Sequence, residues 1–156
     1  MTVIAVAIIG AVLVSMPLFS FPGKRPTQLG IEASRLPPCP SSPNCVSSDA
    51  ADSSHSIAAF ALAIPSREAW LAVRESVEGL PRTKIISETS DYLHAECTSA
   101  VFGFVDDLEL HLRTAEAVIA VRSASRLGYS DLGVNRRRIE DLRALLIEQG
   151  IVAPSA

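Results

Sequence analysis

Three neighbouring runs of the sequence alternate apolar side chains with side chains that carry charge or bind protons. Residues 92–98, 105–112 and 117–123 each follow a period of two, which is typical of strands with one apolar face. Their charged and imidazole groups would gather on the other face: His94, Glu96, Asp107, Glu109, His111 and Arg122. Such a set could bind a cation or perform acid–base chemistry. A solvated polar face with cross-strand ion pairs is the simpler interpretation, and we favour it.

The loops between these runs predict which residues lie opposite one another. In each hairpin the apolar faces match only if an even-numbered residue lies opposite an odd-numbered one. A six-residue loop over 99–104 then places Glu96 opposite Asp107 and His94 opposite Glu109. A four-residue loop over 113–116 gives the pairs Leu112–Ala117, Leu110–Ile119, Leu108–Val121 and Asp107–Arg122. We therefore expect an ion pair between Asp107 and Arg122 on an exposed sheet face.

A second group of candidate functional residues lies where residues 122–139 leave the last strand and enter the last helix. Arginines beside Gly128 and Gly133, near a helix N-terminus, could bind an anion such as phosphate. The candidate ligand-binding residues are Arg126, Tyr129, Ser130, Asp131, Asn135 and Arg136. The simpler interpretation, which we favour, is a connection held by ion pairs and by a helix cap at Asp131 or Asn135.

Common catalytic and cofactor motifs do not occur in the sequence. It holds no Gly-x-Ser-x-Gly, Walker-type loop, Gly-x-Gly-x-x-Gly or His-Glu-x-x-His. The net charge of −3 provides no basic excess for nucleic acid. We therefore expect no cofactor, no metal, no nucleic-acid partner and no catalytic residue. The alternative is an enzyme that acts on a small anionic substrate through residues 126–138.

Two of the three cysteines lie six positions apart in a proline-rich run. A loop this short can bring Cys39 and Cys45 within the Cα separation of about 4.4–6.8 Å that a disulfide needs. We expect that disulfide, because two cysteines are too few for a metal site and a redox pair more often has two residues between its cysteines. Free thiols remain an alternative. Cys97 lies in an alternating run and is expected to be a buried thiol.

The first 22 residues have the composition of a membrane-spanning segment. Residues 3–21 carry no charged side chain, and as a helix they would measure about 28 Å, close to the roughly 30 Å of the hydrocarbon layer. A cleaved signal peptide needs a basic start and a small-residue cleavage site, and neither is evident. A lipoprotein needs a cysteine earlier than Cys39. We predict an uncleaved transmembrane anchor over 1–22, with residues 3–21 in the membrane; a cleaved signal peptide is the alternative.

Two signals disagree about the orientation of this anchor. Lys24 and Arg25 favour a cytoplasmic location of the residues that follow it. The paired cysteines favour an oxidising compartment. We predict that the domain is exported to the periplasmic side.

Length and pattern predict one folded domain after the anchor. A chain of 156 residues holds about one domain. Six of the ten prolines lie between Pro22 and Pro43, so residues 23–54 are expected to be a linker that carries the Cys39–Cys45 loop. Residues 55–152 are expected to form an α+β domain, in which two helices cover one face of an antiparallel sheet of about five strands.

The expected order of elements in this domain is β-α-β-β-β-β-α. The strands are predicted over 55–64, 84–90, 92–98, 105–112 and 117–123. The first helix should have Ser66 as its N-cap and should bury Trp70 as a core anchor. The last helix should end near Gly150.

Three parts of the sequence together resemble one protein family. They are Pro-Cys-Pro-Ser-Ser-Pro-Asn-Cys-Val-Ser-Ser at 38–48, the pair Asp106-Asp107, and Ser-Arg-x-Gly-x-Ser-Asp-Leu-Gly-x-Asn-Arg-x-Arg-Ile at 125–139. They are similar to the domain of unknown function 1499 family over roughly residues 36–151. The resemblance implies a family of bacteria and plastids, often with a membrane or export segment, and it implies no catalytic residue. We expect a membrane-tethered envelope protein that binds a small ligand, a lipid or a protein partner.

Overall fold

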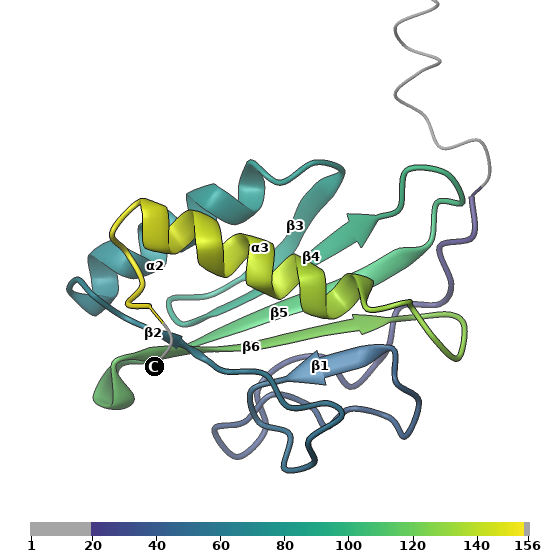
Figure 1. Ribbon diagram of the computed structural model, residues 1–156, viewed down its shortest axis with the longest axis horizontal. Coiled ribbons are helices and arrows are strands. Elements are labelled where there is room, and N and C mark those ends of the chain that lie inside the picture. Colours follow the sequence, from purple (N-terminus) through teal and green to yellow (C-terminus); the bar gives the residue numbers. More distant parts are fainter. Residues whose placement is uncertain (1–19, 155–156) are drawn as a thin grey trace, which may run out of the picture.

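The structure is a computed structural model that describes residues 20–154 (Figure 1). The predicted anchor over 1–22 therefore lies almost wholly outside the described residues. Within the part that is described, no helix combines the length and the apolar composition needed to cross a membrane.

The described chain forms one antiparallel sheet of six strands with two helices, which confirms the α+β class. The sheet order is β1-β6-β5-β4-β3, and β2 also pairs with β6. The strands are β1 Cys45–Ser47, β2 Phe60–Ala61, β3 Thr83–Glu88, β4 Tyr92–Thr98, β5 Val105–Arg113 and β6 Val118–Ser125. The helices are α2 Ser66–Glu78 and α3 Val134–Glu148, and Thr114–Glu116 is a short 3-10 turn.

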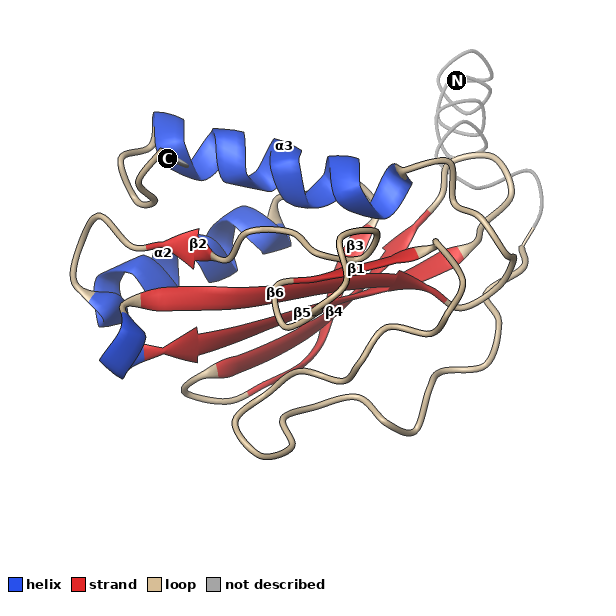
Figure 2. Cartoon of the chain, turned by 60° about the horizontal axis from the view of Figure 1, so that its bottom comes forward, coloured by secondary structure: helices blue, strands red, loops and turns tan. Residues whose placement is uncertain are grey.

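Both helices lie on the same face of the sheet (Figure 2). Helix α2 buries Trp70, Val73 and Val77, which recur at helical spacing, and α3 buries an equivalent stripe. These side chains join the apolar residues of β4, β5 and β6 in one core cluster. The prediction that two helices cover one face, and that Trp70 packs into the core, is confirmed.

Two elements differ from their sequence-based predictions. The strand expected over 55–64 is reduced to Phe60–Ala61, and Cys45–Ser47 adds a strand inside the expected linker. Helix α2 begins at Ser66, but Pro65 occupies the N-cap position and no side chain caps the helix there. The predicted Ser66 cap is therefore wrong by one residue.

The pairing of β5 with β6 differs from the predicted register. Glu96 lies opposite Asp107, and His94 opposite Glu109, as expected. Arg122, however, lies opposite Glu109, and Asp107 lies opposite Ala124. The reason is that Arg113, expected in the loop, belongs to β5 and pairs with Val118, so the loop runs over 114–117 and turns through Ala117 in the left-handed region at φ 51°. Each β5 residue therefore pairs with a β6 residue two positions later than predicted, and because two is the period of a strand, the apolar residues keep the same face.

Candidate functional site

The charged residues of the sheet share one face, but that face is buried. His94, Asp107, Glu109, His111 and Arg122 are each at most 7% exposed, and Glu96 is partly exposed. Residues of the expected linker cover this face, on the side of the sheet opposite the helices (Figure 2). The prediction of a solvated polar face is wrong, because the proline-rich segment packs against the sheet.

Hydrogen bonds attach the covering segment to the charged residues below it. Arg25 forms an ion pair with Glu96 at 2.6 Å. The main-chain amide of Gly30 donates to a carboxylate oxygen of Glu109 at 2.8 Å. The covering segment, which has few periodic apolar residues, thus binds the sheet through a main-chain amide and a basic side chain.

Asp107 is the centre of the buried network. Its carboxylate accepts hydrogen bonds from Arg126 at 2.9 and 2.7 Å, and His94 Nε2 lies 2.7 Å from Oδ1. Burial alone would raise the pKa of Asp107, but the hydrogen bonds from Arg126 and His94 outweigh it and lower that pKa. Arg126 also pairs with Glu96. Its pKa is raised, first of all by the hydrogen bonds with Asp107.

Glu109 is also neutralised within the network. Its carboxylate accepts hydrogen bonds from Arg122 and from the Tyr92 hydroxyl, each at 2.8 Å. Burial, followed by the charge of Glu109, raises the pKa of Tyr92. Both buried carboxylates at the heart of this face therefore already have cationic partners. The arrangement pairs the charges that the fold buries on this face.

The part of the chain that is described holds no group of three or more His, Cys, Asp or Glu side chains placed to bind a metal ion. The carboxylates on this face contact arginines, the Tyr92 hydroxyl and His94 instead. A cation site on this face therefore has no support from the geometry.

The six residues of the predicted anion site have separate roles along the β6–α3 connection. Arg126 belongs to the buried network, and Asn135 is buried. Gly133 occupies the N-cap position of α3, so the cap predicted at Asp131 or Asn135 is wrong by position, although Asp131 accepts the main-chain amides of Gly133 and Asn135 at 3.1 and 2.7 Å. The others are Ser130, which accepts the Leu132 amide, Arg136, which donates to the carbonyls of Ser54 and Ser56, and Tyr129, which is 75% exposed.

The predicted disulfide between Cys39 and Cys45 is present, with the two Cα atoms 5.7 Å apart. Cys97 is free and buried, and its burial raises the pKa of the thiol. The disulfide closes a loop that ends at β1, and β1 pairs with β6. It therefore fixes the proline-rich segment directly to the sheet.

The three sequence runs that suggested the family resemblance meet in the structure. Asp106 and Asp107 are consecutive in β5, so they point to opposite faces of the sheet. Asp106 pairs with Arg138 of α3 at 2.6 Å on the helix side, and Asp107 pairs with Arg126 on the covered side. The cysteine-containing run joins them through Asn44, whose carbonyl accepts a hydrogen bond from Asn135 at 3.0 Å. These contacts hold the three runs together, and we call this set of residues the family lock: Asn44, Asp106, Asp107, Arg126, Asn135 and Arg138.

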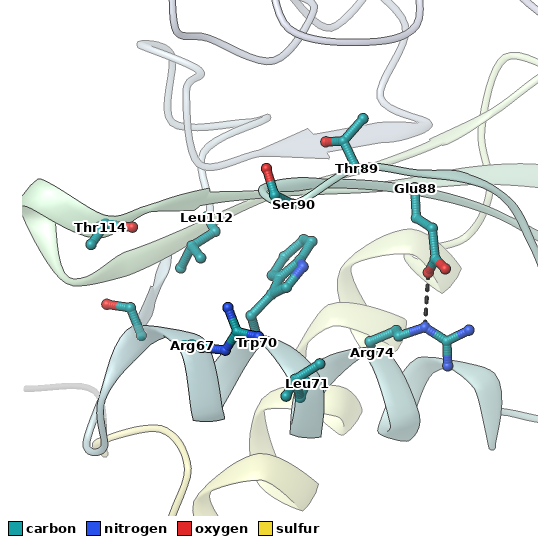
Figure 3. A pocket seen from close by; sticks show the side chains of 10 residues that line it. Arg67, Trp70, Leu71, Arg74, Glu88, Thr89, Ser90, Leu112 and Thr114 are labelled. Carbon is teal, nitrogen blue, oxygen red and sulfur yellow. Dashed lines mark hydrogen bonds and ion pairs between the residues drawn. The ribbon is translucent and has the colours of Figure 1, made fainter.

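The sequence reasoning missed a groove between α2 and the edge of the sheet (Figure 3). Its volume is about 660 Å³. The indole ring of Trp70 points from α2 towards the sheet, between Leu112 and Ser90 (Figure 3). Arg67 and Arg74 flank Trp70 along the helix.

The two arginines of the groove differ in their partners. Arg74 pairs with Glu88 at 2.8 Å and with Glu78 at 2.7 Å, and these hydrogen bonds raise its pKa. Among the described residues, Arg67 has no acidic side chain within ion-pair distance. The spacing of 67, 70 and 74 places all three on one helix face, which is the signal that could have revealed the groove.

The family comparison agrees with the sequence runs that meet at the lock. Residues 35–146 match the family described as Protein of unknown function (DUF1499). No curated protein and no solved structure matches the chain. The family match spans well over half of the chain and includes all three runs. This chain belongs to the DUF1499 family of proteins of unknown function.

Proposed function

We propose that this protein is a membrane-tethered binding module of the cell envelope that holds a small ligand in the groove beside Trp70. The observation that carries the proposal is the pairing of an aromatic wall with Arg67, a cation that no described acidic side chain neutralises. This combination favours a ligand with an apolar body and one anionic group.

The size and lining of the groove fit such a ligand. Small-molecule sites commonly measure about 300–1,000 Å³ and combine apolar walls with a few polar groups. The volume here is about 660 Å³. Leu71, which is 57% exposed, supplies most of the apolar surface, while Trp70 and Leu112 line the groove but are each only 8% exposed; Ser90 and Thr114 supply hydroxyl groups.

The groove is suited to binding rather than to catalysis. Its lining includes no His, Cys or Asp, and its one carboxylate, Glu88, is held by Arg74. Nucleophilic and acid–base catalysis need a reactive group beside a proton acceptor or donor. The alternative enzyme site at 126–138 has less support, because Asp107 and Asp106 already neutralise Arg126 and Arg138.

The tether and the envelope location draw on the N-terminal sequence and on the disulfide. Residues 3–21 are uncharged and long enough to span a bilayer. The Cys39–Cys45 disulfide fits an oxidising compartment, which supports export of the domain to the periplasmic side.

Fluorescence of Trp70 tests ligand binding, because it is the sole tryptophan of the chain. The full chain in detergent micelles is titrated with naphthalene-2-sulfonate, an aromatic anion. We expect Arg67→Gln to weaken binding by about tenfold to a hundredfold, since a hydrogen bond to a charged group contributes roughly 1.5–3 kcal/mol. The matched control, Arg137→Gln, removes an exposed arginine of α3 and should bind as the unaltered chain does. Equal affinity in all three proteins would refute the site.

A further inference from the structure

We propose that one end of the sheet rests in the interfacial layer of a lipid bilayer. This inference depends on the membrane tether proposed above and adds the surface by which the folded domain contacts lipid. The surface, here termed the contact end, consists of Phe21, Val101, Phe102, Phe104 and Leu127.

Four of these side chains form an exposed apolar cluster at the tip of the β4–β5 hairpin. The ring centroids of Phe21 and Phe104 are 5.8 Å apart, as are those of Phe102 and Phe104. The exposed fractions are 48% for Phe21, 47% for Val101, 50% for Phe102 and 41% for Phe104. Apolar residues exposed together, rather than singly, mark an interaction surface.

Leu127 extends this surface from the β6–α3 connection. A Cβ atom placed on Gly23 would lie 3.0 Å from Cγ of Leu127, so the chain after Phe21 passes directly against Leu127. Leu127 itself is 45% exposed. The hairpin, this connection and the start of the described chain lie at one end of the sheet (Figure 1).

The attachment of Phe21 leaves no spacer between a membrane segment and the folded domain. The proposed membrane segment ends at Phe21, and the Phe21 amide donates to the Phe102 carbonyl at 3.2 Å. If residues 3–21 occupy the hydrocarbon layer, the hairpin tip lies at the boundary of that layer. Lys24 and Arg25 follow within four residues, where basic side chains favour the headgroup region.

This placement makes lipid the partner that fits the contact end best. Phenylalanine and leucine side chains lie readily at the boundary between headgroups and acyl chains. The ligand groove lies at the other end of the sheet. Phe104 and Leu112 are eight residues apart along the chain of β5, which corresponds to about 26 Å at roughly 3.3 Å per residue. The groove therefore lies far from the contact end.

Quenching by brominated lipid tests the contact directly. The full chain is reconstituted in phosphatidylcholine vesicles with or without bromine on the acyl chains, and tryptophan emission is compared. The unaltered chain gives the baseline, because Trp70 lies at the groove end. Phe102→Trp adds a probe at the contact end, and Leu71→Trp adds a matched probe at a site that is 57% exposed near the groove.

We expect brominated lipid to remove most of the emission added by Phe102→Trp and little of that added by Leu71→Trp. Val101→Trp, at a second exposed position, should repeat the result and guards against misfolding of the first variant. Equal, weak quenching at positions 102, 101 and 71 in vesicles that retain the protein after an alkaline carbonate wash would overturn the contact and leave the tether standing. Loss of the full chain from the vesicles in that wash would overturn both.

Discussion

The side chain of Asn135, in the first turn of α3, donates a hydrogen bond to the main-chain carbonyl of Asn44 at 3.0 Å. Asn44 adjoins the disulfide, and its own side-chain amide donates to the Gly128 carbonyl at 2.6 Å. Two segments more than eighty residues apart are thus joined in both directions. Asn135 is only 1% exposed, so these bonds lie in a region that excludes water.

Replacing Asn135 with alanine should destabilise the domain by about 1–3 kcal/mol. The substitution removes the acceptor of the buried Ser123 hydroxyl and the donor to the Ser125 hydroxyl, and buried groups that lose a partner carry that cost. Urea unfolding followed by circular dichroism measures it. Arg137→Ala, in the same turn of the helix but exposed, should change the free energy of unfolding by less than about 0.5 kcal/mol. Equal effects of the two variants would show that Asn135 is not part of a structural lock.

Asp107→Ala should be about as costly as Leu110→Ala. Removing one partner of a buried ion pair costs about 3–5 kcal/mol, and opening a cavity at a buried leucine costs about 2–5 kcal/mol. Glu88→Ala breaks an exposed pair with Arg74 and should cost at most about 1 kcal/mol. If Asp107→Ala proved as mild as Glu88→Ala in urea unfolding, the charged face of the sheet would be solvated. That result would contradict the packing of the proline-rich segment over this face.

Alternation of polarity predicted which residues share a face, but it could not tell how that face is covered. A period of two separates Asp107 from Leu108 whether the polar side meets water or another polar segment. The covering segment has no periodic apolar pattern, and it binds partly through main-chain amides such as that of Gly30, which leave no trace in the sequence. A proline-rich run therefore looked like a linker.

The sequence could predict neither the β5–β6 register nor the groove beside Trp70, and the physical reason differs between the two. Ala117 adopts a left-handed conformation at φ 51°, which is uncommon for alanine and could not be expected from the sequence. The predicted β5–β6 loop therefore begins one residue too early. The groove arises where α2 meets the ends of strands far away in the chain. The residues of the family lock, by contrast, could be identified from the sequence as three unusual runs. Only the structure shows that these runs contact one another.

The stability of the domain should fall as the pH drops through the acidic range. Despite burial, hydrogen bonds from arginines lower the pKa of Asp107 and of Glu96 below the ordinary values of 3.8 and 4.5. The unfolded chain then binds more protons than the folded chain, so the contribution is complete above the ordinary values and is lost as the pH falls through the folded ones.

Asp107→Asn tests this origin of the pH dependence. The variant lacks the titrating group, so the difference in free energy of unfolding from the unaltered chain should be largest near pH 6 and should shrink towards pH 3. Urea unfolding at a series of pH values measures it. A difference that stays constant across the series would assign the acid sensitivity to other groups.

Thiol counting tests the Cys39–Cys45 disulfide in cells. The chain has three cysteines, so a trapped, denatured and unreduced sample should react with one equivalent of maleimide, at Cys97. After reduction it should react with three. Three reactive thiols before reduction would place the domain in a reducing compartment and contradict the proposed export.

The location of ligand binding is tested most directly by NMR titration of the full chain in micelles with naphthalene-2-sulfonate. The groove predicts that the indole N–H resonance of Trp70 and the amides around Arg67 shift with a common saturation curve. It also predicts that the amides from Gly128 to Asn135 stay in place, because Asp107 and Asp106 neutralise Arg126 and Arg138, and Arg136 donates to the carbonyls of Ser54 and Ser56. Saturating shifts confined to the Gly128–Asn135 segment, with Trp70 unmoved, would contradict the groove and favour the anion site at the start of α3.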